Sequence, residues 1–102
     1  GDGGVSMFAD ALRVNTSLEV LRLNNNRIGD KGVRVLADVL GVNTSITGLG
    51  LWGHSFGDEG KVLHWRVRKF TEINKGAASP QVAFGQKVKL IAESKHGTIE
   101  DA

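Results

Sequence analysis

The chain of 102 residues repeats one pattern with a period of 28 residues. Residues 18–32 return as residues 46–60 with the same apolar positions, glycines and aspartate: Ile46, Leu49, Leu51, Phe56, Gly57, Asp58 and Gly60. Residues 1–12 match residues 29–40 at the same spacing. The matching residues of the earlier segment are Gly1, Asp2, Gly4, Val5, Phe8, Ala9 and Leu12. Because the period contains no insertion, the sequence predicts a stacked array of similar units.

The complete repeat is residues 17–44, and its first part has the pattern of a short strand. Leu21 and Leu23 alternate with Arg22 and Asn24. Successive side chains of a strand point to opposite faces, so the two leucines are predicted to be buried and the two polar residues exposed. The leucines at the same places in the next repeat are Leu49 and Leu51.

The second part of the repeat predicts a turn followed by a helix. Asn26 stands where the chain leaves the strand, and its amide is expected to bond unpaired backbone groups in a ladder with its counterparts. Asp30 is expected to cap the helix, since its carboxylate can accept from amides of the first turn. An apolar stripe with helical spacing follows, and Gly41 suits the helix end. The stripe consists of Val33, Leu36, Ala37 and Leu40.

Together these positions form the pattern LxxLxLxxNxIGDxGVxxLAxxL over residues 18–40. This pattern resembles the leucine-rich repeats of the ribonuclease-inhibitor type, which also occur in NOD-like receptors and in the activating protein of the Ran GTPase. The resemblance extends over residues 1 to about 60. It implies an α/β leucine-rich-repeat solenoid, with parallel strands on the concave side and helices on the convex side. It also implies that a protein partner binds on the concave side.

The repeat loses its definition after residue 60, where polar residues take over the positions of the apolar stripe. A helix can still be drawn there with a different apolar face, formed by Leu63, Val67 and Phe70. We therefore assign residues 1–60 to leucine-rich repeats, about two and a half in number. Residues 61–102 are assigned to a degenerate repeat helix and an irregular C-terminal segment that can cap the array.

Residues 76–80 predict a turn, and the segment after them has two interpretations. Ser79 as N-cap, with Pro80 at the first helical position, would begin a helix. The other interpretation is a hairpin with residues 85–87 as its loop. Its strands would use the two-residue alternation of Val82, Phe84, Val88, Leu90 and Ala92. We favour strands and expect part of residues 82–92 to pack against the third repeat. The alternative is a poorly packed segment unrelated to the repeats.

A second motif recurs with the period, since Asn15-Thr16-Ser17 returns as Asn43-Thr44-Ser45. Each triplet could accept a glycan in a secreted protein. Both triplets also coincide with the turn from helix to strand. We favour the role in the turn.

The composition restricts the chemistry of the chain. Without cysteine there is no disulfide, no thiolate metal site and no cysteine nucleophile. This fits a reducing compartment, and we expect a cytoplasmic protein. No apolar run approaches the roughly 18 residues of a membrane span.

His54, His64 and His96 lie on different predicted elements, and the glycines of residues 48–53 fall within a strand instead of a phosphate-binding turn. We therefore expect no metal, no cofactor and no enzymatic activity.

Two surfaces are candidates for binding. The first is the concave row with Arg22, Asn24 and Trp52, because exposed Trp and Arg dominate interface energetics. Trp52 could instead fold over the glycines beside it or be covered by the C-terminal segment. The second is the basic segment, residues 61–75, which could bind an anionic surface or nucleic acid, although a solvated helix face is the more ordinary explanation. Its basic and aromatic residues are Lys61, His64, Trp65, Arg66, Arg68, Lys69, Phe70 and Lys75.

The sequence therefore predicts a protein–protein interaction module that binds a protein partner on its concave face, with neither membrane nor nucleic acid expected as a partner. Since the chain begins within a repeat, we expect a piece of a larger leucine-rich-repeat protein. Two other functions stay open. The resemblance alone implies a GTPase-activating regulator, and residues 61–75 could bind an anionic surface or nucleic acid. The residues with a predicted structural role are Leu21, Leu23, Asn26, Asp30, Leu49 and Leu51.

Overall fold

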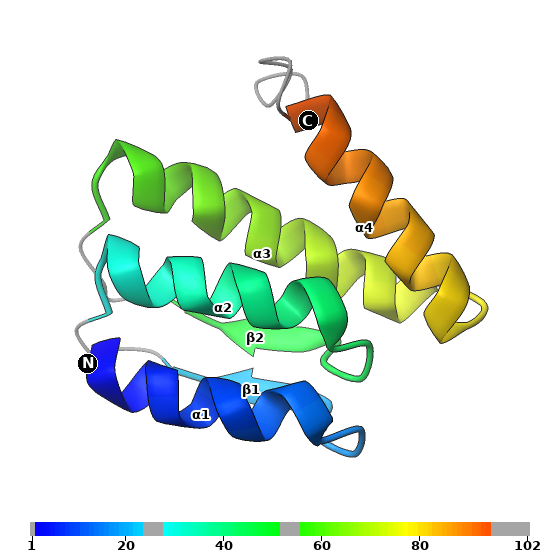
Figure 1. Cartoon of the computed structure of the whole chain (residues 1–102), viewed down its shortest axis with the longest axis horizontal. Coiled ribbons are helices and arrows are strands. Elements are labelled where there is room, and N and C mark those ends of the chain that lie inside the picture. Colours follow the sequence, from blue (N-terminus) through cyan, green and yellow to red (C-terminus); the bar gives the residue numbers. More distant parts are fainter. Residues whose placement is uncertain (1, 24–27, 52–55, 95–102) are drawn as a thin grey trace.

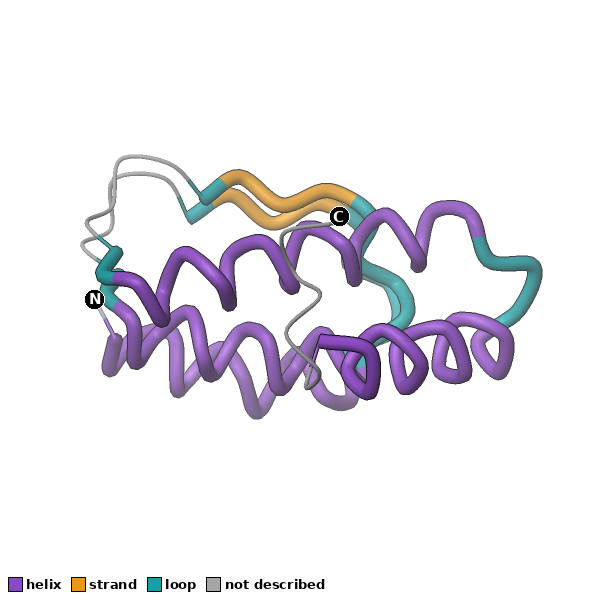
Figure 2. Tube along the Cα trace, turned by 90° about the horizontal axis from the view of Figure 1, so that it is seen from above, coloured by secondary structure: helices purple, strands orange, loops and turns teal. Residues whose placement is uncertain are grey.

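Four helices and two short strands make up the fold in a computed structural model that describes residues 2–23, 28–51 and 56–94. In chain order they are α1 (Asp2–Val14), β1 (Val20–Arg22), α2 (Asp30–Val42), β2 (Gly48–Gly50), α3 (Asp58–Gly76) and α4 (Pro80–Ser94). Helices α1, α2 and α3 lie side by side, and α4 begins beside the C-terminal end of α3 and runs at an angle to it (Figure 1). The two strands lie together on one side of the helices (Figure 2).

The predicted fold class, an α/β solenoid of strands and helices with an irregular C-terminal segment, is wrong. About 70% of the described residues are helical, and the strands among them have only three residues each. One physical reason is that each repeat gives 13 residues to its helix. Another is that β2 has a glycine at each end, and glycine weakens a strand.

The period of the sequence reappears as the register of the parallel strand pair. Leu21 of β1 lies opposite Leu49 of β2, and Arg22 lies opposite Gly50. Beyond the strand, the Leu23 amide donates to the Gly50 carbonyl oxygen at 2.8 Å. Each residue of one repeat therefore meets its counterpart in the next.

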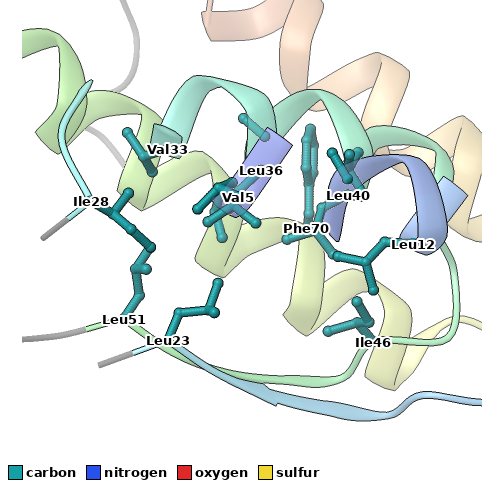
Figure 3. Close-up of a cluster of buried hydrophobic side chains, with 14 residues drawn as sticks. Val5, Leu12, Leu23, Ile28, Val33, Leu36, Leu40, Ile46, Leu51 and Phe70 are labelled. Atoms are coloured by element: carbon teal, nitrogen blue, oxygen red, sulfur yellow. The ribbon is translucent and has the colours of Figure 1, made fainter. Parts of the chain in front are cut away.

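The core lies between the strands and the helices (Figure 3). Four labelled residues from the strand segments and the loops beside them point toward the helices in Figure 3: Leu23, Ile28, Ile46 and Leu51. The predicted stripe of α2 is buried at all four positions: Val33, Leu36, Ala37 and Leu40. Leu36 is fully buried because α2 packs against both α1 and α3. Burial of such a side chain contributes roughly 1.5–3 kcal/mol, so the middle helix organises the core.

The strand leucines are buried to different degrees. Leu23 and Leu51 are buried, whereas Leu21 and Leu49 are only half-buried. The prediction that Leu21 is buried is therefore corrected. It lies in β1, which pairs on one side only among the described residues, so no further strand covers that flank.

Asp30 was predicted to cap α2, and this is wrong. Gly29 is the N-cap residue, without a side-chain cap bond, and Asp30 is the first helical residue. Its carboxylate instead accepts a 2.8 Å hydrogen bond from the Gly57 amide of the next repeat. A Cβ on Gly57 would lie 2.8 Å from this carboxylate, and a Cβ on Gly60 would collide with it. The repeated glycines therefore let the next repeat approach this aspartate.

The asparagine ladder predicted at Asn26 lies outside the described residues, but another ladder joins the opposite ends of the repeats. The Asn43 Nδ2 donates to the carbonyl oxygens of Leu12 at 2.8 Å and Asn15 at 3.1 Å. One unit further on, the Asn74 Nδ2 donates to the carbonyl oxygens of Asn43 at 3.0 Å and Ile46 at 2.8 Å. The preferred role of the Asn43 triplet in the turn is confirmed, since Asn43 is only 4% exposed.

The preference for strands in residues 82–92 is wrong, because this segment belongs to α4. The Ser79 Oγ accepts a 3.2 Å hydrogen bond from the Val82 amide, and Pro80 is the first helical residue. Ala83 and Lys87 are both buried, and their separation by four positions is helical spacing. The helix packs against α3 and α2, so the expected contact with the preceding repeat is present in a different secondary structure.

Candidate functional site: a strand face and a helix junction

The strand face, formed by β1 and β2, holds the described part of the predicted concave row. Val20 is 52% exposed and Arg22 is exposed, with no ion pair to any described residue. The register partners are Gly48 and Gly50, and a Cβ on Gly48 would lie only 3.4 Å from Val20 Cγ2. This face therefore combines an apolar side chain and an exposed cation with glycine backbone.

The other two residues predicted to bind a partner, Asn24 and Trp52, lie outside the described residues. Whether Arg22, Asn24 and Trp52 form one surface therefore stays a prediction. The period supports it, since Asn24 and Trp52 stand one full period apart and follow strands that pair in that register.

The outer face of α1 is a second open surface. Phe8 is 51% exposed, whereas its counterpart in the next repeat, Leu36, is fully buried. Met7 and Val14 are also exposed apolar residues of α1. A neighbouring helix covers this position in α2, and no described element covers it in α1.

The basic segment predicted at residues 61–75 divides between two sides of α3, because adjacent helical residues point about 100° apart. Most of its charge lines a depression of about 370 Å³, the basic depression, formed by Lys61, His64, Trp65, Arg68, Lys69 and Glu72. The Lys69 Nζ lies 5.8 Å from the Trp65 ring centroid and 3.5 Å from a Glu72 oxygen. Arg66 belongs to a different cavity, so the segment does not act as one cluster.

That cavity, the junction pocket, has a volume of about 280 Å³ and lies where α2, α3 and α4 meet. Its main lining residues are Arg66, Phe70, Phe84, Lys87, Val88 and Ile91. The sequence interpretation missed it because Lys87 was assigned to a hairpin loop. Ala83, Lys87 and Leu90 share one face only when the segment is helical, and this spacing was the available signal.

Lys87 is the most unusual charged residue of the junction pocket, with only 1% of its surface exposed. Its Nζ donates to the carbonyl oxygens of Leu40 at 2.6 Å and Asn43 at 2.7 Å, at the C-terminal end of α2. Carbonyls at a helix C-terminus lack helical partners and carry partial negative charge, so the ammonium satisfies them. Burial lowers the pKa of Lys87 from 10.5 to about 8, so the amine is mostly protonated at neutral pH.

Within residues 2–23, 28–51 and 56–94, no group of three or more His, Asp or Glu side chains is arranged to hold a metal ion. None of the helices in this part of the chain is both long and apolar enough to span a membrane. Of the three histidines, His64 is described and packs 5.4 Å from the Phe56 ring, while His54 and His96 lie outside the described residues.

Comparison with known families finds one match. Residues 14–37 match the family model described as Leucine Rich repeat, which supports a leucine-rich repeat at this position. The matched segment begins at the last residue of α1, contains β1 and ends within α2. No curated protein and no solved structure matches the chain significantly. A leucine-rich repeat suggests a protein-interaction module as the class of function.

Proposed function

We propose that the chain binds a protein partner through its strand face, with Arg22, Asn24 and Trp52 as the contact residues. The observation that carries the proposal is the arrangement of β1. Val20 and Arg22 are exposed beside half-buried Gly48 and buried Gly50 of β2, so these two side chains are the groups that the strand pair presents to a partner. An apolar side chain next to an arginine is a common composition of an interface centre.

The proposal includes the type of repeat and the absence of catalysis. The strand register, which follows the period of the sequence, supports the ribonuclease-inhibitor type of leucine-rich repeat. In this proposal the chain takes no cofactor and performs no chemistry of its own.

The test has two stages. The unmodified chain first captures interacting molecules, and the captured protein is then purified and its affinity for the chain is measured. We expect Arg22→Glu and Trp52→Ala to weaken that affinity by at least about 30-fold, the effect of losing a central interface residue. Lys31→Glu makes the same charge change at an exposed position of α2, away from the strand face, and is expected to have little effect.

The outcomes separate the strand face from the other candidates. Equal affinities of the Arg22→Glu, Trp52→Ala and Lys31→Glu variants would refute binding through the strand face. Capture that disappears after nuclease treatment, and that Arg68→Gln weakens, would instead assign binding to the basic depression. Recovery of a small GTPase whose hydrolysis accelerates would replace the proposal with a catalytic function.

A further inference from the structure

The junction pocket combines apolar walls with two cations. Phe70, Phe84, Val88 and Ile91 provide the apolar surface. Both Phe84 and Val88 are about half exposed, although a helix in contact with two others could have buried them. An apolar cavity with a few polar groups is the usual composition of a small-molecule site. The pocket is therefore a candidate for a ligand that has both an apolar and a charged part.

The two cations contribute to the pocket in different ways. The Arg66 Nε is buried and has no hydrogen-bond partner among the described residues. A buried charged donor without a partner is unfavourable, so an acceptor that draws the half-buried Arg66 guanidinium toward the pocket would be favourable. Lys87 uses two of its three ammonium donors for the Leu40 and Asn43 carbonyl oxygens. Its Nζ also lies 5.6 Å from the Phe70 ring centroid and the residue is only 1% exposed, so Lys87 contributes positive charge to the pocket and no open donor.

The charge of the lining favours an anion. Among the described residues, Asp38 is the one acidic side chain that lines the junction pocket, against the two cations Arg66 and Lys87. None of these three residues forms an ion pair with another described residue. The arginine fork matches the two oxygens of a carboxylate, and this geometry favours a carboxylate over a single charged atom.

The volume limits the size of the ligand. The cavity of about 280 Å³ equals roughly nine times the volume of a water molecule in the liquid. A compound of roughly ten non-hydrogen atoms suits this volume, which corresponds to a carboxylate with a chain of about eight carbons. Larger lipids would have to extend beyond the pocket along the exposed side of α4.

We propose that the junction pocket binds a small amphipathic carboxylate, with its anionic group on Arg66, near the positive charge of buried Lys87, and its apolar chain on Phe84 and Val88. The carboxylate accepts from the half-buried guanidinium of Arg66, and the chain covers the half-exposed apolar residues of α4. Because α2, α3 and α4 all contribute to the lining, the ligand fastens α4 to the rest of the fold. This site lies on the helices, apart from the strand face.

The experiment titrates the whole chain with octanoate by calorimetry and follows backbone amide shifts by NMR. We expect saturable binding, with the largest shifts at residues 84–91 of α4 and around Arg66. 1-Octanol, which has the same chain length without the charge, is expected to bind at least tenfold more weakly. Shifts confined to other elements, or equal binding of octanol, would overturn the proposal without any variant.

Substitutions test the residues. Arg66→Gln is expected to weaken octanoate binding about tenfold or more, the effect of losing a hydrogen bond to a charged group. The matched control is Arg68→Gln, which removes the same charge from the same helix but lines the basic depression. Phe84→Ala shortens the apolar wall at a half-exposed position and is expected to weaken octanoate and octanol together. Equal weakening by Arg66→Gln and Arg68→Gln would show nonspecific attraction and refute the site.

Discussion

Replacement of Asn43 by alanine tests the ladder that joins the repeats. The Asn43 Nδ2 donates to the carbonyl oxygens of Leu12 and Asn15 of the preceding repeat. The Asn43 Oδ1 accepts from the amides of Ser45 at 2.9 Å and Ile46 at 3.0 Å within its own turn. The alanine variant therefore loses these four hydrogen bonds at a site that is almost fully buried.

The size of the effect follows from these four bonds. Each contributes a net of about 0.5–1.5 kcal/mol to the free energy of unfolding, and buried groups left without a partner add to the loss. Some of the backbone groups that lose their partner will bind water instead, so we expect Asn43→Ala to lower the free energy of unfolding by about 3 kcal/mol. That is a large part of the roughly 5–15 kcal/mol typical of a domain.

Asn15→Ala is the matched control, because Asn15 holds the same position in the preceding repeat. Its Oδ1 accepts from the amides of Ser17 and Leu18, both at 2.8 Å, but Asn15 is exposed and its Nδ2 makes no bond to a described residue. Water can replace the lost bonds there, so we expect a loss of about 1 kcal/mol.

The assay is urea unfolding of the unmodified chain, Asn43→Ala and Asn15→Ala, followed by circular dichroism. With a urea dependence of roughly 1.5 kcal/mol per molar, the midpoint of Asn43→Ala should fall by about 2 M. The midpoint of Asn15→Ala should fall by less than half of that. Equal shifts for the two variants would refute the claim that the bonds between repeats, and not the turn itself, carry the stability.

Three further predictions use the same unfolding assay. The pKa of Lys87 is lower in the folded chain than the ordinary 10.5, so between about pH 8 and pH 10.5 the unfolded chain binds more protons. This residue's contribution to the free energy of unfolding should therefore rise with pH across that window, and Lys87→Met should lose the rise. Gly60→Ala should lower the free energy of unfolding by about 1–3 kcal/mol, because the added methyl group collides with the Asp30 carboxylate. Gly85→Ala has open space around it and should raise the free energy of unfolding by up to about 1 kcal/mol. Leu23→Ala should cost about 2–5 kcal/mol, and half-buried Leu21→Ala should cost less; equal losses would contradict their different burial.

Much of the arrangement of residues 2–23 and 28–51 could be predicted from the sequence, although the fold class could not. A period without insertions makes each residue meet its counterpart, and this fixes the register of Leu21 with Leu49. The helical spacing of the α2 stripe identified its buried face, because a 3.6-residue period places those side chains on one side. Such local and periodic features depend on spacing within the chain, so the sequence alone determines them.

The tertiary structure decided the features that depend on a distant partner. Asn15 and Asn43 occupy equivalent positions in the sequence, but among the described residues it is the Asn43 amide, and not that of Asn15, that reaches carbonyl oxygens of a preceding repeat. The Asp30 carboxylate bonds the Gly57 amide instead of its own helix, because the next repeat brings that amide within 2.8 Å. The hydrogen-bond partners of Asn43 and Asp30 lie in another repeat, so the residues next to them in the sequence do not reveal these partners.

Helix α4 shows most clearly how contacts with distant residues decide a local structure. Its two-residue apolar alternation suited a strand, yet the segment is helical because that conformation aligns Ala83 with Lys87 against α2 and α3. A lysine counts as a surface residue by its type. Here the Lys87 ammonium donates hydrogen bonds to carbonyl oxygens at the C-terminal end of α2, and these bonds make its burial possible. Helix α2 belongs to the complete repeat, far earlier in the chain.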